Sequence, residues 1–138
     1  MDHTPPPPTI LLFDGVCNLC NRSIDWLIRH DPHAALRFAP QQSSGGQRLL
    51  AAHGLGPAPA SVVAIAGDEV LTESAAVLHA LSRLPEPWPD VAALGSTIPA
   101  PLRDALYRFV AARRYALFGR RETCRVPSEQ ERVRFVES

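Results

Sequence analysis

The chain has 138 residues, of which 46% are hydrophobic and 20% charged, and its 14 basic residues balance 14 acidic ones. This length predicts one domain that buries a core without metals or staples. The zero net charge provides no field to attract nucleic acid or a membrane surface, and no apolar run is long enough to span a bilayer. Three cysteines are too few for a disulfide-built secreted domain. We therefore expect a cytoplasmic protein that binds neither nucleic acid nor membranes.

The N-terminal part of the chain predicts a tail followed by alternating strands and helices. Residues 1–8 are proline-rich and predict a disordered tail, without the basic and apolar regions of a signal peptide. Short apolar runs bounded by Gly, Pro or Asp indicate strands, and apolar residues repeating on one face indicate helices. The predicted strands are 9–13, 36–39, 61–66 and 69–72, and the predicted helices are 18–30, 43–53 and 74–84. The order is β-α-β-α-β-β-α.

The third of these helices has its own capping and packing prediction. Ser74 stands where a residue that caps a helix N-terminus is expected. The apolar residues that follow it repeat at helical spacing, so we expect them on the inner face of the helix. They are Val77, Leu78, Leu81 and Leu84.

Residues 85–138 predict an α-helical extension of the same domain, which spans 9–138 with its core at about 9–84. A proline-rich stretch leads into a short helix, and Pro101 stands near the start of a stronger one that Gly119 ends. Ser128 and Glu131 have the spacing of a capping box for a last helix through Phe135. The stronger helix carries an apolar stripe: Leu102, Ala105, Leu106, Phe109 and Val110, extended by Leu117 and Phe118.

The motif FDGVCNLC places Cys17 and Cys20 one helical turn apart, directly after the first strand. A zinc site, a structural disulfide and a redox-active disulfide all use this spacing. A structural zinc site needs four ligands, and the next candidates are His30 and His33. His30 would lie roughly 15 Å from the cysteines, at the far end of the helix. The spacing therefore favours redox chemistry over zinc.

Thiol–disulfide exchange needs one thiolate and a second thiol that resolves the mixed disulfide. A helix N-terminus favours the thiolate, because its free N–H groups and partial positive charge stabilise an anion. Cys17 stands at this end of the first predicted helix, and Cys20 lies one turn further on its apolar face. We therefore expect Cys17 to be an exposed nucleophile and Cys20 a buried resolving thiol.

The element order with Cys-x-x-Cys after the first strand is similar to that of thioredoxin-like proteins. More narrowly, Asp14, Cys17 and Cys20 resemble the Asp-x-x-Cys-x-x-Cys signature of the DCC family of thiol–disulfide oxidoreductases. The C-terminal run through residues 107–121 and Cys124 also resembles that family. The resemblance implies a thioredoxin-like fold and a redox role for Cys17 and Cys20. We expect no cofactor, and a protein or small-molecule disulfide or thiol as substrate.

Two positions depart from thioredoxin. The place of its cis-proline before the third strand falls on Ala60, one past Pro59, so we expect an altered substrate-binding backbone. Asn18 and Leu19 stand between the cysteines, where thioredoxin has glycine and proline. The reduction potential is therefore expected to differ from that of thioredoxin.

Asp14 and Cys124 each have two interpretations. Asp14 either relays a proton to or from Cys20 during resolution or accepts loop N–H groups in an Asx-turn. Cys124 lies among arginines, which would make an exposed thiol reactive, but we favour a small buried residue. The alternatives for the whole chain are a redox-inert, thioredoxin-like protein-binding module and a small zinc-binding protein.

Overall fold

The computed structural model describes residues 7–136, so most of the predicted tail lies outside the described residues. Four strands form one sheet in the order β2-β1-β3-β4. β1 runs parallel to β2 and antiparallel to β3, which is antiparallel to β4. The strands are β1 (Thr9–Phe13), β2 (Leu36–Pro40), β3 (Val63–Ala66) and β4 (Glu69–Thr72). The four predicted strands are confirmed, although β3 begins two residues later than expected.

Three helices cover the two faces of this sheet: α1 (Asn18–Arg29), α2 (Ser44–Ala52) and α3 (Glu73–Ser82). One core cluster joins the sheet to α1 and α3, and a second cluster joins its other face to α2. The predicted β-α-β-α-β-β-α order is therefore confirmed. α2 begins as a capped helix should, because the Ser43 hydroxyl accepts a hydrogen bond from the Gly46 N–H at 3.0 Å.

The start of α3 corrects the predicted cap. Thr72 occupies the N-cap position, whereas the Ser74 hydroxyl and N–H both donate to the Asp104 carboxylate. The inner face of α3 also differs from the prediction, because Val77 is 43% exposed while Ala76 and Ala80 are buried. The C-terminal part of the predicted face is confirmed, because Leu84 is buried in the core and Leu81 packs against it. At the start of α3, small residues therefore face the sheet instead of Val77.

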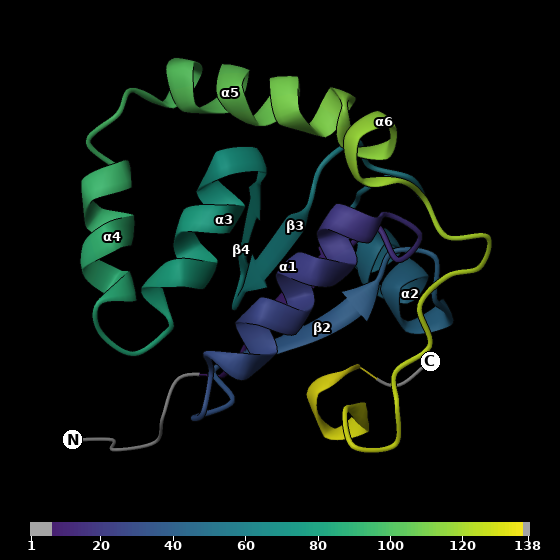
Figure 1. Ribbon diagram of the computed structural model, residues 1–138. Helices are drawn as coiled ribbons and strands as arrows, with labels where there is room; N and C mark the ends of the chain where they lie inside the picture. The colour runs from purple at the N-terminus through teal and green to yellow at the C-terminus, as the bar shows by residue number, and fades with distance from the viewer. Residues whose placement is uncertain (1–6, 137–138) are drawn as a thin grey trace.

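The extension contains α4 (Trp88–Gly95), α5 (Ala100–Ala112) and α6 (Arg114–Phe118). α5 runs from α4 to α6 along the edge of the molecule beyond α3 (Figure 1). Its predicted apolar stripe does not enter the core: Leu106 and Phe109 are each 57% exposed. The inner edge of α5 is polar instead, with Asp104 bonded to Ser74 and Arg108 paired with Glu73 at 2.7 Å.

Gly119 ends α6 with a φ of +85°, which favours glycine, and the chain then continues without a helix to residue 131. The capping-box bonds between Ser128 and Glu131 form, but the predicted last helix is only a 3₁₀ turn at Arg132–Arg134. Phe135 then returns to the core beside Phe38.

Within residues 7–136, no helix combines the length and apolar character needed to cross a membrane.

Candidate functional site

Cys17 and Cys20 lie at the junction of β1 and α1, where the sequence predicts them. Cys17 is the N-cap of α1, and its Sγ accepts a hydrogen bond from the Cys20 N–H at 3.4 Å. The side chain of Asn21 fixes the loop, because its amide donates to the carbonyls of Gly15 and Cys17 at 2.9 Å each. All three cysteines are free thiols. The helix N-terminus thus directs an N–H group at the Cys17 sulfur, an arrangement that stabilises negative charge there.

The exposure predicted for the two thiols is wrong. Cys17 is 0% exposed, whereas Cys20 is half-buried. Residues 118–121, here called the covering segment, run antiparallel to the loop and pair Arg120 with Cys17. Its backbone is bonded on both sides of Cys17: Arg121 N–H donates to the Val16 carbonyl at 2.7 Å and Asn18 N–H to the Gly119 carbonyl at 3.3 Å. Sequence reasoning missed this cover because it comes from a segment a hundred residues away.

The Cys20 thiol is strongly biased toward its protonated form. Burial raises its pKa to about 12, with further contributions from the hydrogen bond and charge of Cys17 and from the charge of Asp14. A thiol with this pKa is not ionised at neutral pH. Any attack by Cys20 therefore requires a group that removes its proton.

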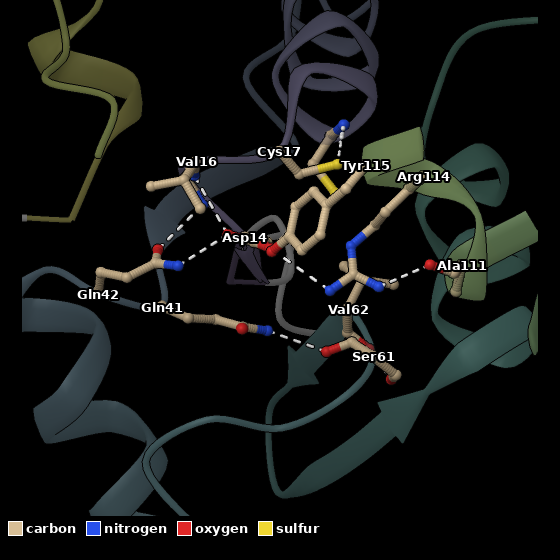
Figure 2. Close-up of polar contacts among 12 residues, drawn as sticks. Asp14, Val16, Cys17, Gln41, Gln42, Ser61, Val62, Ala111, Arg114 and Tyr115 are labelled. Atoms are coloured by element: carbon tan, nitrogen blue, oxygen red, sulfur yellow. Dashed lines mark hydrogen bonds and ion pairs between the residues drawn. The ribbon is translucent and has the colours of Figure 1, made fainter. Parts of the chain in front are cut away.

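Asp14 is held at the centre of a polar network that Figure 2 shows between Gln42 on one side and Tyr115 and Arg114 on the other. One carboxylate oxygen accepts from the Val16 N–H at 3.1 Å and from the Gln42 amide at 2.7 Å. The other accepts from the Tyr115 hydroxyl and pairs with Arg114 at 3.4 Å. The Asx-turn bond predicted for Asp14 is therefore present, together with three partners from distant segments.

Partial burial of Asp14 opposes ionisation, but the hydrogen bonds from Tyr115, Gln42 and Val16 and the charge of Arg114 outweigh it. The pKa of Asp14 is consequently held below its ordinary value. The site thus keeps an ionised carboxylate within electrostatic reach of the protonated Cys20 thiol.

Sequence reasoning missed Asn21, Gln42 and the roles of Arg114 and Tyr115. Arg114 and Tyr115 lie in the run that resembles the DCC family, which was the one available signal. Cys124 also approaches the loop: a Cβ on Gly15 would lie 2.6 Å from its Sγ. Burial and the charge of Asp14 raise the pKa of Cys124, which supports a packing role over a reactive one.

The sequence predicts an altered substrate-binding backbone at Ala60, in the segment before β3. Among residues 7–136 the cis peptide bond lies elsewhere, at Glu86–Pro87. The Tyr107 hydroxyl of α5 accepts a hydrogen bond from the Val62 N–H at 2.9 Å. The extension therefore occupies a backbone donor close to Ala60.

The arginines of the C-terminal part of the chain take several different roles. Arg125 is buried and pairs with Asp25 and Glu131 at 2.7 Å each, while Arg114 pairs with Asp14. Within the described residues 7–136, no three His, Cys, Asp or Glu side chains gather in a way that could hold a metal ion.

A four-stranded sheet of this order, with a Cys-x-x-Cys loop at the N-terminus of its first helix, defines a thioredoxin-like α/β protein. Residues 11–120 match the family model described as DCC1-like thiol-disulfide oxidoreductase. The chain therefore belongs to the DCC1-like family, as the Asp14, Cys17 and Cys20 signature indicates.

The chain is also similar to two curated proteins over most of its length. The chain is 39% identical over 132 residues to the uncharacterized protein YuxK of Bacillus subtilis (strain 168), covering 94% of this chain and 95% of YuxK. It is 40% identical over 116 residues to a chloroplastic DCC family protein of Arabidopsis thaliana, covering 83% of this chain and 67% of that protein. No solved structure matches the chain.

Proposed function

We propose that this protein is a thiol–disulfide oxidoreductase that cycles Cys17 and Cys20 between dithiol and disulfide. The observation that carries the proposal is the position of Cys17 as N-cap of α1, with its sulfur bonded to the Cys20 N–H. Membership of the DCC1-like family supports the same reaction class. The substrate is a protein or small-molecule disulfide or thiol, and the small number of cysteines favours a reducing, cytoplasmic setting.

In the reductive direction, the Cys17 thiolate attacks a substrate disulfide, forms a mixed disulfide and releases one substrate thiolate. Cys20 then attacks the Cys17 sulfur, releases the second substrate thiolate and leaves the Cys17–Cys20 disulfide. The Cys20 proton must be removed in this step, since the thiol has a pKa of about 12. Asp14 is our proposed acceptor, because its ionised carboxylate is held beside the two cysteines.

Because the covering segment buries Cys17, attack on a substrate requires residues 118–121 to move away from the loop. Few hydrogen bonds join the covering segment to the loop. α6 ends at Gly119, so the last two residues of the covering segment lie outside the helix. Local opening at low free energy is typical of such exposed segments.

The test is reduction of insulin disulfides with dithiothreitol as electron donor. We expect activity in the wild type, none in Cys17→Ser, and a mixed disulfide on Cys17 that accumulates in Cys20→Ser. Equal inactivity of wild type and Cys17→Ser would reject the proposal. It would favour a redox-inert binding module, for which the exposed stripe of α5 offers a surface: Leu106 and Phe109 are each 57% exposed.

A further inference from the structure

A cavity of about 510 Å³ opens beside the Cys17–Cys20 loop, between α1, α3 and α5. This volume lies in the range of pockets that hold small organic ligands, roughly 300–1,000 Å³. Its walls are mainly apolar, including Leu11 and Phe13 of β1, Ile24 and Trp26 of α1, and Val77 of α3. The shape and lining suit a small molecule with an apolar body.

The cavity exists because α3 presents small side chains and α5 is held above them. Ala76 and Ala80 line the cavity where larger residues would fill it. α5 is fixed on the other side of the cavity by polar contacts, such as the hydrogen bond from the Val62 N–H to the Tyr107 hydroxyl, and its Val110 and Ala111 line the cavity.

The sulfurs of Cys17 and Cys20 differ in their access to this cavity. Cys20 lines it, whereas Cys17 does not line it and is closed off by the covering segment. Three polar groups that line the cavity interact electrostatically with Cys20: Asp14 and Arg114, which form an ion pair, and the hydroxyl-bearing Tyr107. A ligand with an apolar body and one polar sulfur would therefore place its sulfur at Cys20.

We propose that this cavity binds a small apolar thiol, the electron donor that reduces the Cys17–Cys20 disulfide by attacking Cys20. The inference rests on the proposed function, because it requires that disulfide to form. It gives each cysteine its own partner: the oxidised substrate meets Cys17 when the covering segment opens, and the donor thiol meets Cys20 from the cavity.

The chemistry balances with two equivalents of the donor. The first thiolate attacks the Cys20 sulfur, the bond between Cys17 and Cys20 breaks, and Cys17 leaves as a thiolate stabilised at the N-terminus of α1. A second thiolate attacks the donor sulfur of the mixed disulfide and releases Cys20, which takes a proton. Two donor thiols become one donor disulfide, and the protein returns to the dithiol.

The test measures how fast the oxidised wild-type protein is reduced by benzyl mercaptan and by β-mercaptoethanol, an apolar and a polar thiol of similar acidity. We expect benzyl mercaptan to react roughly 10- to 100-fold faster at low concentration, which is the gain from burying one phenyl group. Its rate should saturate with concentration, and mass spectrometry should find the mixed disulfide on Cys20.

Two variants fill the cavity and one controls for them. Val77→Trp and Ala80→Leu should bring the rate ratio of the two thiols close to one. Val91→Trp is the matched control, because Val91 is 42% exposed, like Val77 at 43%, but lies on α4 outside the cavity. It should keep the wild-type ratio. Using both cavity variants ensures that poor folding of one does not decide the result.

Three outcomes would overturn the inference while leaving the proposed function intact: equal rates for the two thiols, unchanged ratios in both cavity variants, or benzyl mercaptan attached to Cys17. In each of them β-mercaptoethanol still reduces the protein. If the Cys17–Cys20 disulfide cannot be formed, or neither thiol reduces it, both the inference and the proposed function are rejected.

Discussion

Asp14 is the residue that distinguishes this loop from a plain Cys-x-x-Cys motif. The sequence leaves it two roles, proton transfer and loop bracing, and the contacts support both. Its bond from Val16 N–H braces the turn, while its charge acts on Cys20. Partners from α6 make its position depend on the extension as well as on the loop. Separating the roles requires a substitution that preserves shape and removes charge.

Asp14→Asn is predicted to prolong the mixed disulfide on Cys17, because asparagine can accept the bonds from Val16 and Gln42 but cannot take a proton from Cys20. General-base contributions are about 10²- to 10⁴-fold, so even the lower end is visible in a quenched time course. Asp14→Ala should also lose stability, roughly 0.5–2 kcal/mol by analogy with a lost helix cap. A wild-type lifetime in Asp14→Asn would leave Asp14 as a structural residue.

The same residue predicts a pH dependence of stability. The pKa of Asp14 is lower in the folded protein than its ordinary value, so its ionised form stabilises the fold. That contribution is complete above about pH 4, the ordinary aspartate pKa, and is lost as the pH falls through the folded value. Urea unfolding at pH 7 and pH 3 should therefore show the advantage of wild type over Asp14→Asn shrinking in acid. An unchanged difference between the two proteins would contradict this assignment.

Among the elements, the covering segment controls access to Cys17. Two features favour glycine at position 119. Its φ is +85°, and a Cβ there would lie 2.9 Å from the side-chain amide nitrogen of Asn18. Gly119→Ala is therefore predicted to displace the segment and expose Cys17. Backbone strain of this kind costs about 1–3 kcal/mol, enough to change the open population roughly fivefold or more.

Iodoacetamide alkylation of Cys17 at neutral pH measures that opening. It should be slow in the wild type and several-fold faster in Gly119→Ala, with Gly56→Ala as control, because a Cβ on Gly56 meets nothing within 4 Å. Cys20 should remain slow in both variants, since its pKa is about 12. Equal Cys17 rates in the two glycine variants would show that the segment does not limit access.

At the scale of the whole molecule, the parts set by local patterns were predictable and the parts set by distant contacts were not. The four strands, α1, α2 and the glycine end of α6 follow from short-range periodicity and breakers. The position of Cys17 at a helix N-terminus follows in the same way. Helical spacing marks an apolar stripe on α5 but cannot say what it faces, and Leu102 is 55% exposed.

The candidate site, too, was predictable only where local sequence patterns determine it. Its three signature residues, Asp14, Cys17 and Cys20, lie close together in the sequence, so their proximity needed no tertiary information. The burial of Cys17, the bonds of Tyr115 to Asp14 and the cavity beside Cys20 all depend on segments about 40 to 100 residues away. The exposure of the two thiols was therefore predicted the wrong way round, because a local helix argument cannot foresee a distant cover.

The C-terminal segment connects these distant parts, and its anchor is Phe135. This residue is 2% exposed, and its ring centroid lies 6.2 Å from that of Phe13 and 5.9 Å from that of Phe38. Beside it, the Val136 N–H donates to the Phe38 carbonyl at 2.8 Å. The end of the chain is thus part of the same core that supports the Cys17 loop.

Phe135→Ala is predicted to lower the free energy of unfolding by about 3–5 kcal/mol, the range for a phenylalanine removed from a packed core. Val133→Ala is the matched control two residues earlier, at a side chain 80% exposed, and should change it by about 0.5 kcal/mol or less. Urea unfolding of both variants at neutral pH measures the difference. Because the loop and the covering segment rest on this core, Phe135→Ala should also speed alkylation of Cys17 while the protein remains folded. Equal stability of the two variants would place the C-terminal segment outside the core and leave the covering segment without its distal anchor.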